Sequence, residues 1–177
     1  MEKNIVLIGF MGTGKTSIGM RLARTLKREF VDTDREIETL TGMNVFTIFK
    51  KYGEVRFRSE EELLTKKLAL RKRLVIATGG GMVLNPHNLE ILSENGILIC
   101  LQADPATILN RVKKKKQARP LLGKEVTLER IVELLEARKD FYSRANIVVN
   151  TSGLSPDEIV AEILTKLRGV NDETAKS

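Results

Sequence analysis

Five short apolar runs, each followed by a longer stretch with helical periodicity, constrain this chain most strongly. The runs hold valine, isoleucine and leucine without polar alternation, which is typical of strands buried on both faces of a parallel sheet. The predicted strands cover residues 4–8, 28–32, 74–78, 97–101 and 146–150. Because parallel neighbours need crossover connections, the alternation predicts a doubly wound α/β sandwich.

Apolar residues at helical spacing and candidate N-caps place helices between these strands. Gly53 predicts a break between two of the helices. The predicted helices cover residues 15–27, 34–41, 44–51, 54–72, 86–95, 105–112, 127–143 and 156–167. The length of 177 residues suits one domain, which we assign to residues 1–168, with a flexible tail at 169–177.

Composition excludes some classes of protein. The net charge of +7 favours anionic partners, but it does not choose between nucleic acid, membranes and phosphorylated metabolites. The aromatic content of 5% argues against stacking platforms for single-stranded nucleic acid. A single cysteine, Cys100, allows no internal disulfide, and no apolar run suits a signal peptide or a membrane span. We therefore expect a cytoplasmic protein.

The stretch GFMGTGKTS at residues 9–17 directly follows the first predicted strand. Gly9, Gly14, Lys15 and Thr16 fit the pattern G-x-x-x-x-G-K-[ST], with a strand before it and a helix after it. Such glycines let backbone N–H groups and a helix N-terminus surround phosphate oxygens. Lys15 is expected to reach the β- and γ-phosphates and Thr16 to hold Mg²⁺. The motif predicts a nucleoside triphosphate site, which kinases, GTPases and motors share.

Acidic residues and glycines follow the next two predicted strands, where open α/β sheets bind ligands. Of Asp32 and Asp34, one is suited to holding hydrated Mg²⁺ and the other to accepting a proton from an attacking hydroxyl. Capping of the following helix is an equally good interpretation. The glycines at 79–81 allow a close approach of backbone to a ligand, although a strained turn is the alternative.

Arginines offer anion contacts on two later helices. The guanidinium forks of Arg58 and Arg138 match a carboxylate or a phosphate, although a solvated, salt-bridged helix face explains them as well. Between Arg111 and Lys124 lie seven cations, counting both ends, and no acidic residue. This segment is interpreted as a lid in which Arg119 stabilises a transferring phosphoryl group, as a solvated tether, or as a nucleic-acid contact.

In their order and spacing these motifs resemble shikimate kinase over about residues 4–167. The matching stretches are IVLIGFMGTGKTSIG, FVDTDREIE, IFKKYGEVRFRSEE, VIATGGGMV, ARPLL and ARKDFYSRA. The resemblance implies a P-loop three-layer sandwich of nucleoside-monophosphate-kinase type, with a five-stranded parallel sheet in the order 2-3-1-4-5. It also implies substrate-binding helices at about 33–61, a mobile lid at about 112–124, and transfer of the ATP γ-phosphoryl group to the 3-hydroxyl of shikimate, in chorismate and aromatic amino-acid biosynthesis.

The resemblance further implies roles for single residues. Asp34 orients the hydroxyl and acts as base, with Lys15 and Arg119 completing the catalytic set. The implied substrate contacts are Asp34, Arg58, Glu61, Gly79, Gly80, Gly81 and Arg138. The implied ATP contacts are Gly12, Thr13, Gly14, Lys15, Thr16, Ser17, Arg111 and Arg119. Mg²⁺ is implied at Thr16 and Asp32.

We expect ATP and shikimate as partners, no nucleic acid or membrane partner, and a monomer. Two other classes stay open: another small-molecule kinase of this fold, such as a gluconate or nucleotide kinase, and a P-loop protein that binds nucleic acid through its basic segment. A catalytically dead relative is a third alternative, against which the presence of every expected motif residue argues. The lysines at 113–116 lie outside the recognised motifs and receive no role.

Overall fold

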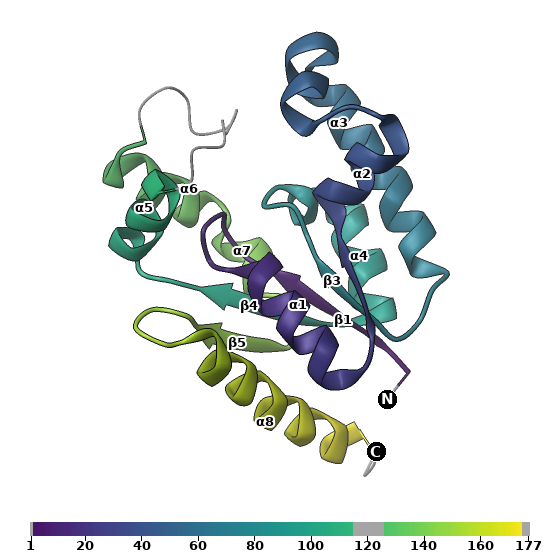
Figure 1. Ribbon diagram of the computed structural model, residues 1–177, viewed down its shortest axis with the longest axis vertical. Coiled ribbons are helices and arrows are strands. Elements are labelled where there is room, and N and C mark those ends of the chain that lie inside the picture. Colours follow the sequence, from purple (N-terminus) through teal and green to yellow (C-terminus); the bar gives the residue numbers. More distant parts are fainter. Residues whose placement is uncertain (1, 115–125, 175–177) are drawn as a thin grey trace.

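A computed structural model describes residues 2–114 and 126–174 of the chain. Within these ranges the chain forms a parallel sheet of five strands in the order β2-β3-β1-β4-β5, as the resemblance implied (Figure 1). The strands are β1 Asn4–Ile8, β2 Glu29–Asp32, β3 Leu74–Ala77, β4 Gly96–Gln102 and β5 Ile147–Asn150. β1 lies in the centre, with Ile5 aligned to Val75 on one side and to Ile97 on the other. The carboxyl ends of all five strands therefore meet at one edge of the sheet.

The helices agree with the sequence expectations except at three places. They are α1 Lys15–Leu26, α2 Thr33–Thr41, α3 Val45–Ala69, α4 Pro86–Asn95, α5 Pro105–Lys114, α6 Leu128–Ala137, α7 Lys139–Tyr142 and α8 Pro156–Thr174, with a 3-10 turn η1 at Met82–Leu84. The single helix expected over 127–143 is wrong, because Arg138 ends α6 and α7 starts after it. α8 runs past the expected end at 167, as far as Thr174. No helix was expected over 82–84.

The break predicted at Gly53 is present as a kink inside α3, where the glycine has φ 82° and ψ 173°. That conformation is nearly restricted to glycine, because a Cβ would clash with the backbone. The kink turns the second part of α3, which carries Glu54, Arg58 and Glu61, relative to the first part.

Alternating strand residues separate the core into two layers. Val6 and Ile8 of β1 belong to a cluster that includes residues of α3, α4, α5 and α6, whereas Ile5 and Leu7 belong to a second cluster with residues of α1 and α8. Successive side chains of a strand point to opposite faces, so both faces of the sheet are covered by helices. The result is a three-layer sandwich, in which Cys100 is fully buried as a core residue.

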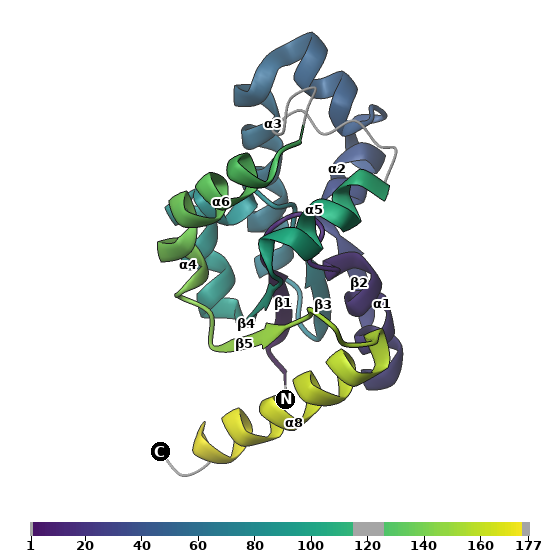
Figure 2. The same ribbon diagram turned by 90° about the vertical axis from the view of Figure 1, so that its left-hand side faces the viewer.

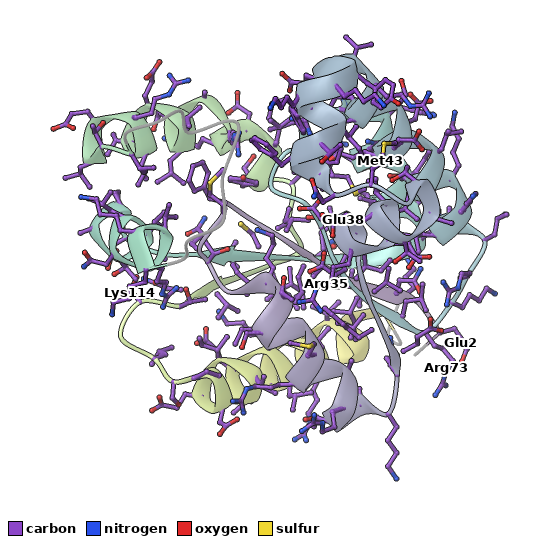
Figure 3. All side chains as sticks on the ribbon, turned by 45° about the horizontal axis from the view of Figure 1, so that its top comes forward. Glu2, Arg35, Glu38, Met43, Arg73 and Lys114 are labelled. Atoms are coloured by element: carbon purple, nitrogen blue, oxygen red, sulfur yellow. The ribbon has the colours of Figure 1, made fainter. Side chains whose placement is uncertain are left out.

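Helices rise beyond the carboxyl edge of the sheet at two places. α2 and the first part of α3 stand at one end, and α5 and α6 stand at the other (Figures 1 and 2). The opposite, amino edge carries an ion pair of 3.3 Å between Arg73, just before β3, and Glu2, just before β1 (Figure 3). The candidate site residues gather at the carboxyl edge, between the two sets of helices.

None of the helices in residues 2–114 and 126–174 has the length and apolar character needed to cross a membrane.

Candidate active site

The loop between β1 and α1 has a backbone that only glycine adopts easily. Gly9, Gly12 and Gly14 have φ values of 137°, 80° and 98°, and Gly14 is the N-cap of α1. A Cβ at Gly9 would clash with the carbonyl oxygen of Leu101 on β4, so this position also requires glycine on packing grounds. The buried Thr13 hydroxyl donates to the carbonyl of Phe10 at 2.7 Å and closes the loop. The loop and the start of α1 form a concave anion-binding element.

Lys15 lies inside this loop. Its Nζ donates to the carbonyl oxygens of Gly9 and Phe10 at 2.8 Å and 2.9 Å, and only 9% of the residue is exposed. A buried ammonium group bonded to neutral carbonyls is placed to bond an incoming phosphate, which is a stronger, charged acceptor. Ser17 is exposed on α1, one residue past the motif.

Thr16 and Asp32 meet at the carboxyl ends of β1 and β2. The Thr16 hydroxyl donates to Asp32 Oδ2 at 2.7 Å. The other oxygen of Asp32 accepts from the backbone N–H of Arg35 at 3.3 Å, and Asp32 is the N-cap of α2. The capping interpretation of Asp32 is therefore confirmed, and its other oxygen, which accepts from Thr16, is left beside the phosphate loop. These hard oxygen donors suit Mg²⁺.

Asp34 lies on the first turn of α2, and its Oδ1 is buried with no hydrogen-bond partner among the described residues. Burial, reinforced by the charge of Asp32, raises the pKa of Asp34 to about 6, although Lys15 and Arg58 lower it. A carboxylate with a raised pKa and an unused acceptor atom is suited to accepting a proton from a hydroxyl.

Glu61 is the second buried acid, with 1% of the residue exposed. Its Oε2 accepts from Arg58 Nη1 at 2.7 Å, and its Oε1 has no partner in the described part of the chain. Burial raises the pKa of Glu61 to about 7, against the lowering effect of Arg58, and the charge of Asp34 raises it further. Glu61 therefore both supports Arg58 and offers one unused oxygen.

The three glycines after β3 bring the predicted acceptor-side groups together. A Cβ at Gly79 would clash with Asp34 Oδ1, a Cβ at Gly80 would lie 3.8 Å from Arg138 Nη1, and a Cβ at Gly81 would lie 2.5 Å from Arg58 Nη1. Consecutive Cα atoms are about 3.8 Å apart, so the three groups meet a stretch of backbone at most about 7.6 Å long. One carboxylate and two guanidinium groups thus lie along the same short stretch of backbone.

Arg138 reaches the glycine run from the break between α6 and α7. It is 5% exposed, its Nη1 donates to the Gly80 carbonyl at 3.1 Å, and its guanidinium lies 5.0 Å from the centre of the Phe10 ring. A continuous helix over 127–143 would place this side chain differently, so the corrected helix boundary is part of the site. Phe10 belongs to the phosphate loop, and a Cβ at Gly80 would lie 3.6 Å from Met11 N. The acceptor-side groups therefore adjoin the phosphate loop directly.

Arg111 on α5 connects the phosphate loop to the segment after β5. Its Nη1 donates to the Gly12 carbonyl at 3.2 Å and to Thr151 Oγ1 at 2.9 Å, and its Nη2 donates to the Thr151 carbonyl at 2.9 Å. Arg111 thus lies beside the phosphate loop, and its neighbour there is Thr151. Its implied contact with ATP stays a prediction. The predicted lid residue Arg119 lies outside the described residues.

Some contributors were not found from the sequence. Thr33 accepts a hydrogen bond from the Gly79 N–H at 2.8 Å and fixes the glycine run to α2. Glu54 pairs with Arg58 at 2.8 Å, Phe10 lies against Arg138, and Thr151 holds Arg111. The spacing of Glu54 and Arg58 at i and i+4 was a usable signal, since such pairs face each other on a helix. The contacts of Phe10, Thr33 and Thr151 join residues far apart in the chain and left no local signal.

A known protein family matches most of this chain. The family model described as "SKI: Shikimate kinase" matches residues 11–168. The chain belongs to the shikimate kinase family. A shikimate kinase of Pelotomaculum thermopropionicum is 56% identical over 96% of this chain and 98% of its own. A shikimate kinase of Desulforudis audaxviator is 53% identical over 94% of this chain and 87% of its own.

Solved structures support the same family. A shikimate kinase from Acinetobacter baumannii in complex with shikimate has a TM-score of 0.89 at 38% identity and covers 94% of this chain and 93% of its own. A shikimate kinase from Aquifex aeolicus has a TM-score of 0.83 at 36% identity, with coverage of 95% and 98%. A gluconokinase from Sinorhizobium meliloti has a TM-score of 0.64 at 16% identity, which shows a shared fold and no more. The resemblance expected from the sequence and the sheet order are both confirmed.

Proposed function

We propose that this protein transfers the γ-phosphoryl group of ATP to the 3-hydroxyl of shikimate and forms shikimate 3-phosphate. The observation that carries this proposal is the glycine run, where Asp34, Arg138 and Arg58 meet three consecutive residues beside the phosphate loop. Shikimate is a small carboxylic acid with ring hydroxyls, so it needs an acceptor for a hydroxyl proton and cations for its carboxylate. In this proposal Asp34 supplies the acceptor, and Arg58 and Arg138 supply the cations.

ATP binds through the phosphate loop in this proposal. The nucleotide contacts come from Gly12, Thr13, Gly14, Lys15, Thr16 and Ser17. When the γ-phosphate arrives, Lys15 exchanges the carbonyls of Gly9 and Phe10 for phosphate oxygens and neutralises charge that develops during transfer. Arg111 borders the adenine beside Thr151, and Arg119 stabilises the transferring group, a role that rests on the sequence resemblance alone.

The acceptor hydroxyl is oriented by Asp34. Its Oδ1 is buried without a partner among the described residues and is the atom that accepts the hydroxyl hydrogen bond. As the oxygen attacks phosphorus, its proton passes to this carboxylate, whose raised pKa makes it a better base than an exposed aspartate. Gly79, which leaves room for this carboxylate, keeps the backbone out of the way.

The substrate carboxylate is held by Arg58 and Arg138, with Gly80 and Gly81 beneath it. Glu61 fixes Arg58 through its Oε2, and its unused Oε1 is available to a ring hydroxyl. Two guanidinium groups around one carboxylate fix both the position and the orientation of the ring. Orientation matters because the other ring hydroxyls must be kept away from the γ-phosphate.

The reaction requires Mg²⁺, which the oxygens of Thr16 and Asp32 would hold. These two groups lie 2.7 Å apart beside the phosphate loop, and hard oxygen donors are what Mg²⁺ prefers. The ion supplies charge neutralisation between the phosphates when it is bound. In the protein alone, Asp32 accepts the Thr16 hydrogen bond and caps α2, so both residues are held in position beforehand.

The chain acts as a single kinase domain over residues 1–168, with substrate-binding helices at about 33–61, a lid at about 112–124, and a tail at 169–177 whose first six residues continue α8. The lid assignment rests on the sequence, because most of that segment lies outside the described residues. We further propose a cytoplasmic monomer whose partners are ATP and shikimate, without a nucleic-acid or membrane partner.

The test is magnesium-dependent release of ADP with shikimate, gluconate or AMP as acceptor. We expect turnover with shikimate, at least about a hundredfold slower release with the other two, and loss of activity when Mg²⁺ is chelated. Phosphorylation of gluconate or AMP at a rate comparable to that of shikimate would contradict the proposal. Retained turnover when the lysines at 113–116 are neutralised would separate the kinase from a nucleic-acid-binding protein.

A further inference from the structure

Arg58 has two carboxylate partners in this structure, and they differ in burial. Glu61 accepts from Nη1 at 2.7 Å and its side chain is 1% exposed. Glu54 accepts from Nε at 3.1 Å and from Nη2 at 2.8 Å, and its side chain is 55% exposed. A single oxygen of Glu54, Oε1, therefore accepts from both nitrogens of one guanidinium edge, and the side chain lies partly in solvent.

A guanidinium group presents two edges on which a carboxylate can bind with both oxygens, the Nη1–Nη2 edge and the Nε–Nη2 edge. The backbone of Gly81 stands at the first edge. A Cβ built on Gly81 would lie 2.5 Å from Nη1, 2.7 Å from Nη2 and 2.9 Å from Cζ of Arg58. The built Cβ is nearer to both Nη atoms than to Cζ. It therefore lies outward from the Nη1–Nη2 edge and not above the guanidinium plane. The edge that remains for a bidentate carboxylate is the one that Glu54 occupies.

Glu54 is placed to leave this edge. It directly follows Gly53, the kink of α3, and is therefore in the first turn of the second part of that helix. An ion pair between partly exposed groups contributes little stability, because water solvates both partners well when they separate. Glu61, in contrast, is buried and has no comparable route to solvent, so it stays with Arg58.

We propose that Glu54 is an internal competitor that holds the carboxylate-binding edge of Arg58 until the substrate carboxylate displaces it. This inference rests on the function proposed above and adds a residue that competes with the substrate carboxylate for Arg58. An incoming acid must replace a carboxylate that is already bound, which lowers the affinity of any acid that binds at this edge. An acid that also reaches Arg138 gains a second cation and completes the exchange.

The test is calorimetric measurement of the dissociation constants of shikimate and of benzoate, a carboxylate without ring hydroxyls, with the Glu54→Gln variant. The amide keeps the size of the side chain but loses the charge that competes. We expect both ligands to bind about two- to fivefold more tightly than to the unaltered protein. The affinity for ATP is expected to be unchanged. The matched control is Glu60→Gln, which removes the partly buried partner of the exposed Arg56 and is expected to change none of the three constants.

The opposite result would overturn the inference. If Glu54 instead holds Arg58 in position for the substrate, Glu54→Gln weakens shikimate binding, and unchanged binding of both acids likewise excludes competition. Glu54→Ala provides a second variant with the same expectation, should the amide keep its bonds to Arg58. Turnover of the unaltered protein with shikimate is measured separately. Its absence would contradict the proposed function, while tighter benzoate binding by the variants would still support the exchange at Arg58.

Discussion

Asp34 holds a buried oxygen that has no partner within the described residues, beside a second acid and against the backbone of Gly79. A buried carboxylate of this kind costs folding free energy when it is charged. The pKa of about 6, compared with the usual 3.8, expresses that cost. The folded protein holds the proton more tightly than the unfolded chain does. The proton on Asp34 therefore contributes fully to the stability of the folded protein below pH 3.8, and this contribution is lost as the pH rises through about 6.

The Asp34→Asn variant tests both the role of Asp34 in turnover and its effect on the stability of the protein. We expect turnover to fall by at least about a hundredfold, since the amide cannot accept the hydroxyl proton. The variant is expected to be more stable than the unaltered protein at pH 8, by roughly 1–3 kcal/mol, and to lose this advantage at pH 4. Steady-state ADP release and denaturant unfolding at the two pH values measure these effects. The exposed Asp140 gives a control, Asp140→Asn, which should change neither quantity.

Arg58 and Arg56 form a matched pair of arginines on the same helix. Arg58 faces the glycine run, whereas the exposed Arg56 makes an ion pair with Glu60 at 2.6 Å. We expect Arg58→Ala to raise the KM for shikimate by at least about tenfold, because a charge-assisted contact is lost. Arg56→Ala should leave that KM within about twofold. Equal effects of the two substitutions on KM would show that Arg58 does not contact the substrate.

At the scale of single elements, the kink in α3 depends on one residue. Gly53 has φ 82° and ψ 173°, and Gly42 after α2 has φ 67° and ψ 14°. A Cβ at either glycine would meet no atom within 4 Å, so the cost of a side chain there is conformational strain alone. Residues other than glycine enter the left-handed helical region of Gly42 at moderate cost, but rarely the region of Gly53.

We therefore expect Gly53→Ala to lower the free energy of unfolding by about 1–3 kcal/mol, and Gly42→Ala to lower it by about 1 kcal/mol. Gly53→Ala should also raise the KM for shikimate, because the kink orients the part of α3 that carries Arg58. Thermal unfolding and steady-state kinetics of the two variants make the comparison. A larger loss of stability in Gly42→Ala than in Gly53→Ala would contradict this account of the kink.

Four of the strands were predictable because each holds an uninterrupted apolar run, whereas β2 holds only Phe30 and Val31 between charged residues. The phosphate loop was predictable because its glycines, lysine and threonine follow a fixed spacing. The break between α6 and α7 at Arg138 was not predictable from the sequence. The residues on both sides of it favour a helix, and the interruption shows itself only through contacts with Gly80 and Phe10, which are distant in the sequence. Local periodicity carries no information about such contacts. For the same reason, the hydrogen bond between Thr33 and Gly79 could not be predicted.

At the scale of the whole molecule, the sheet order brings the site together. β2 and β3 lie side by side, so the residues that follow them, Asp34 and Gly79, come into contact although they are 45 positions apart. The sequence indicated which residues belong at the carboxyl edge, because strand ends gather there. It could not indicate that each of three successive glycines meets a different functional group, since that depends on how α2, α3 and α6 are seated.

Ligand binding should stabilise the whole domain by linkage. We expect shikimate at a hundred times its dissociation constant to add about 2.7 kcal/mol to the free energy of unfolding, a rise in Tm of about 5–10 °C for a chain of this size. ADP with Mg²⁺ should give a separate increase. In Arg138→Ala the shift with shikimate should shrink while the shift with ADP remains. Loss of both shifts would indicate general damage and not a missing carboxylate contact.

The central claim is that Arg58 and Arg138 recognise a carboxylate while Asp34 accepts the proton of a hydroxyl on the same molecule. The most direct measurement compares kcat/KM for shikimate with kcat/KM for its methyl ester, which keeps every hydroxyl and loses only the charge. We predict a decrease of at least about a hundredfold for the ester, and a much smaller decrease once Arg58 and Arg138 are both replaced by alanine. Equal kcat/KM values for the acid and the ester with the unaltered protein would contradict the account.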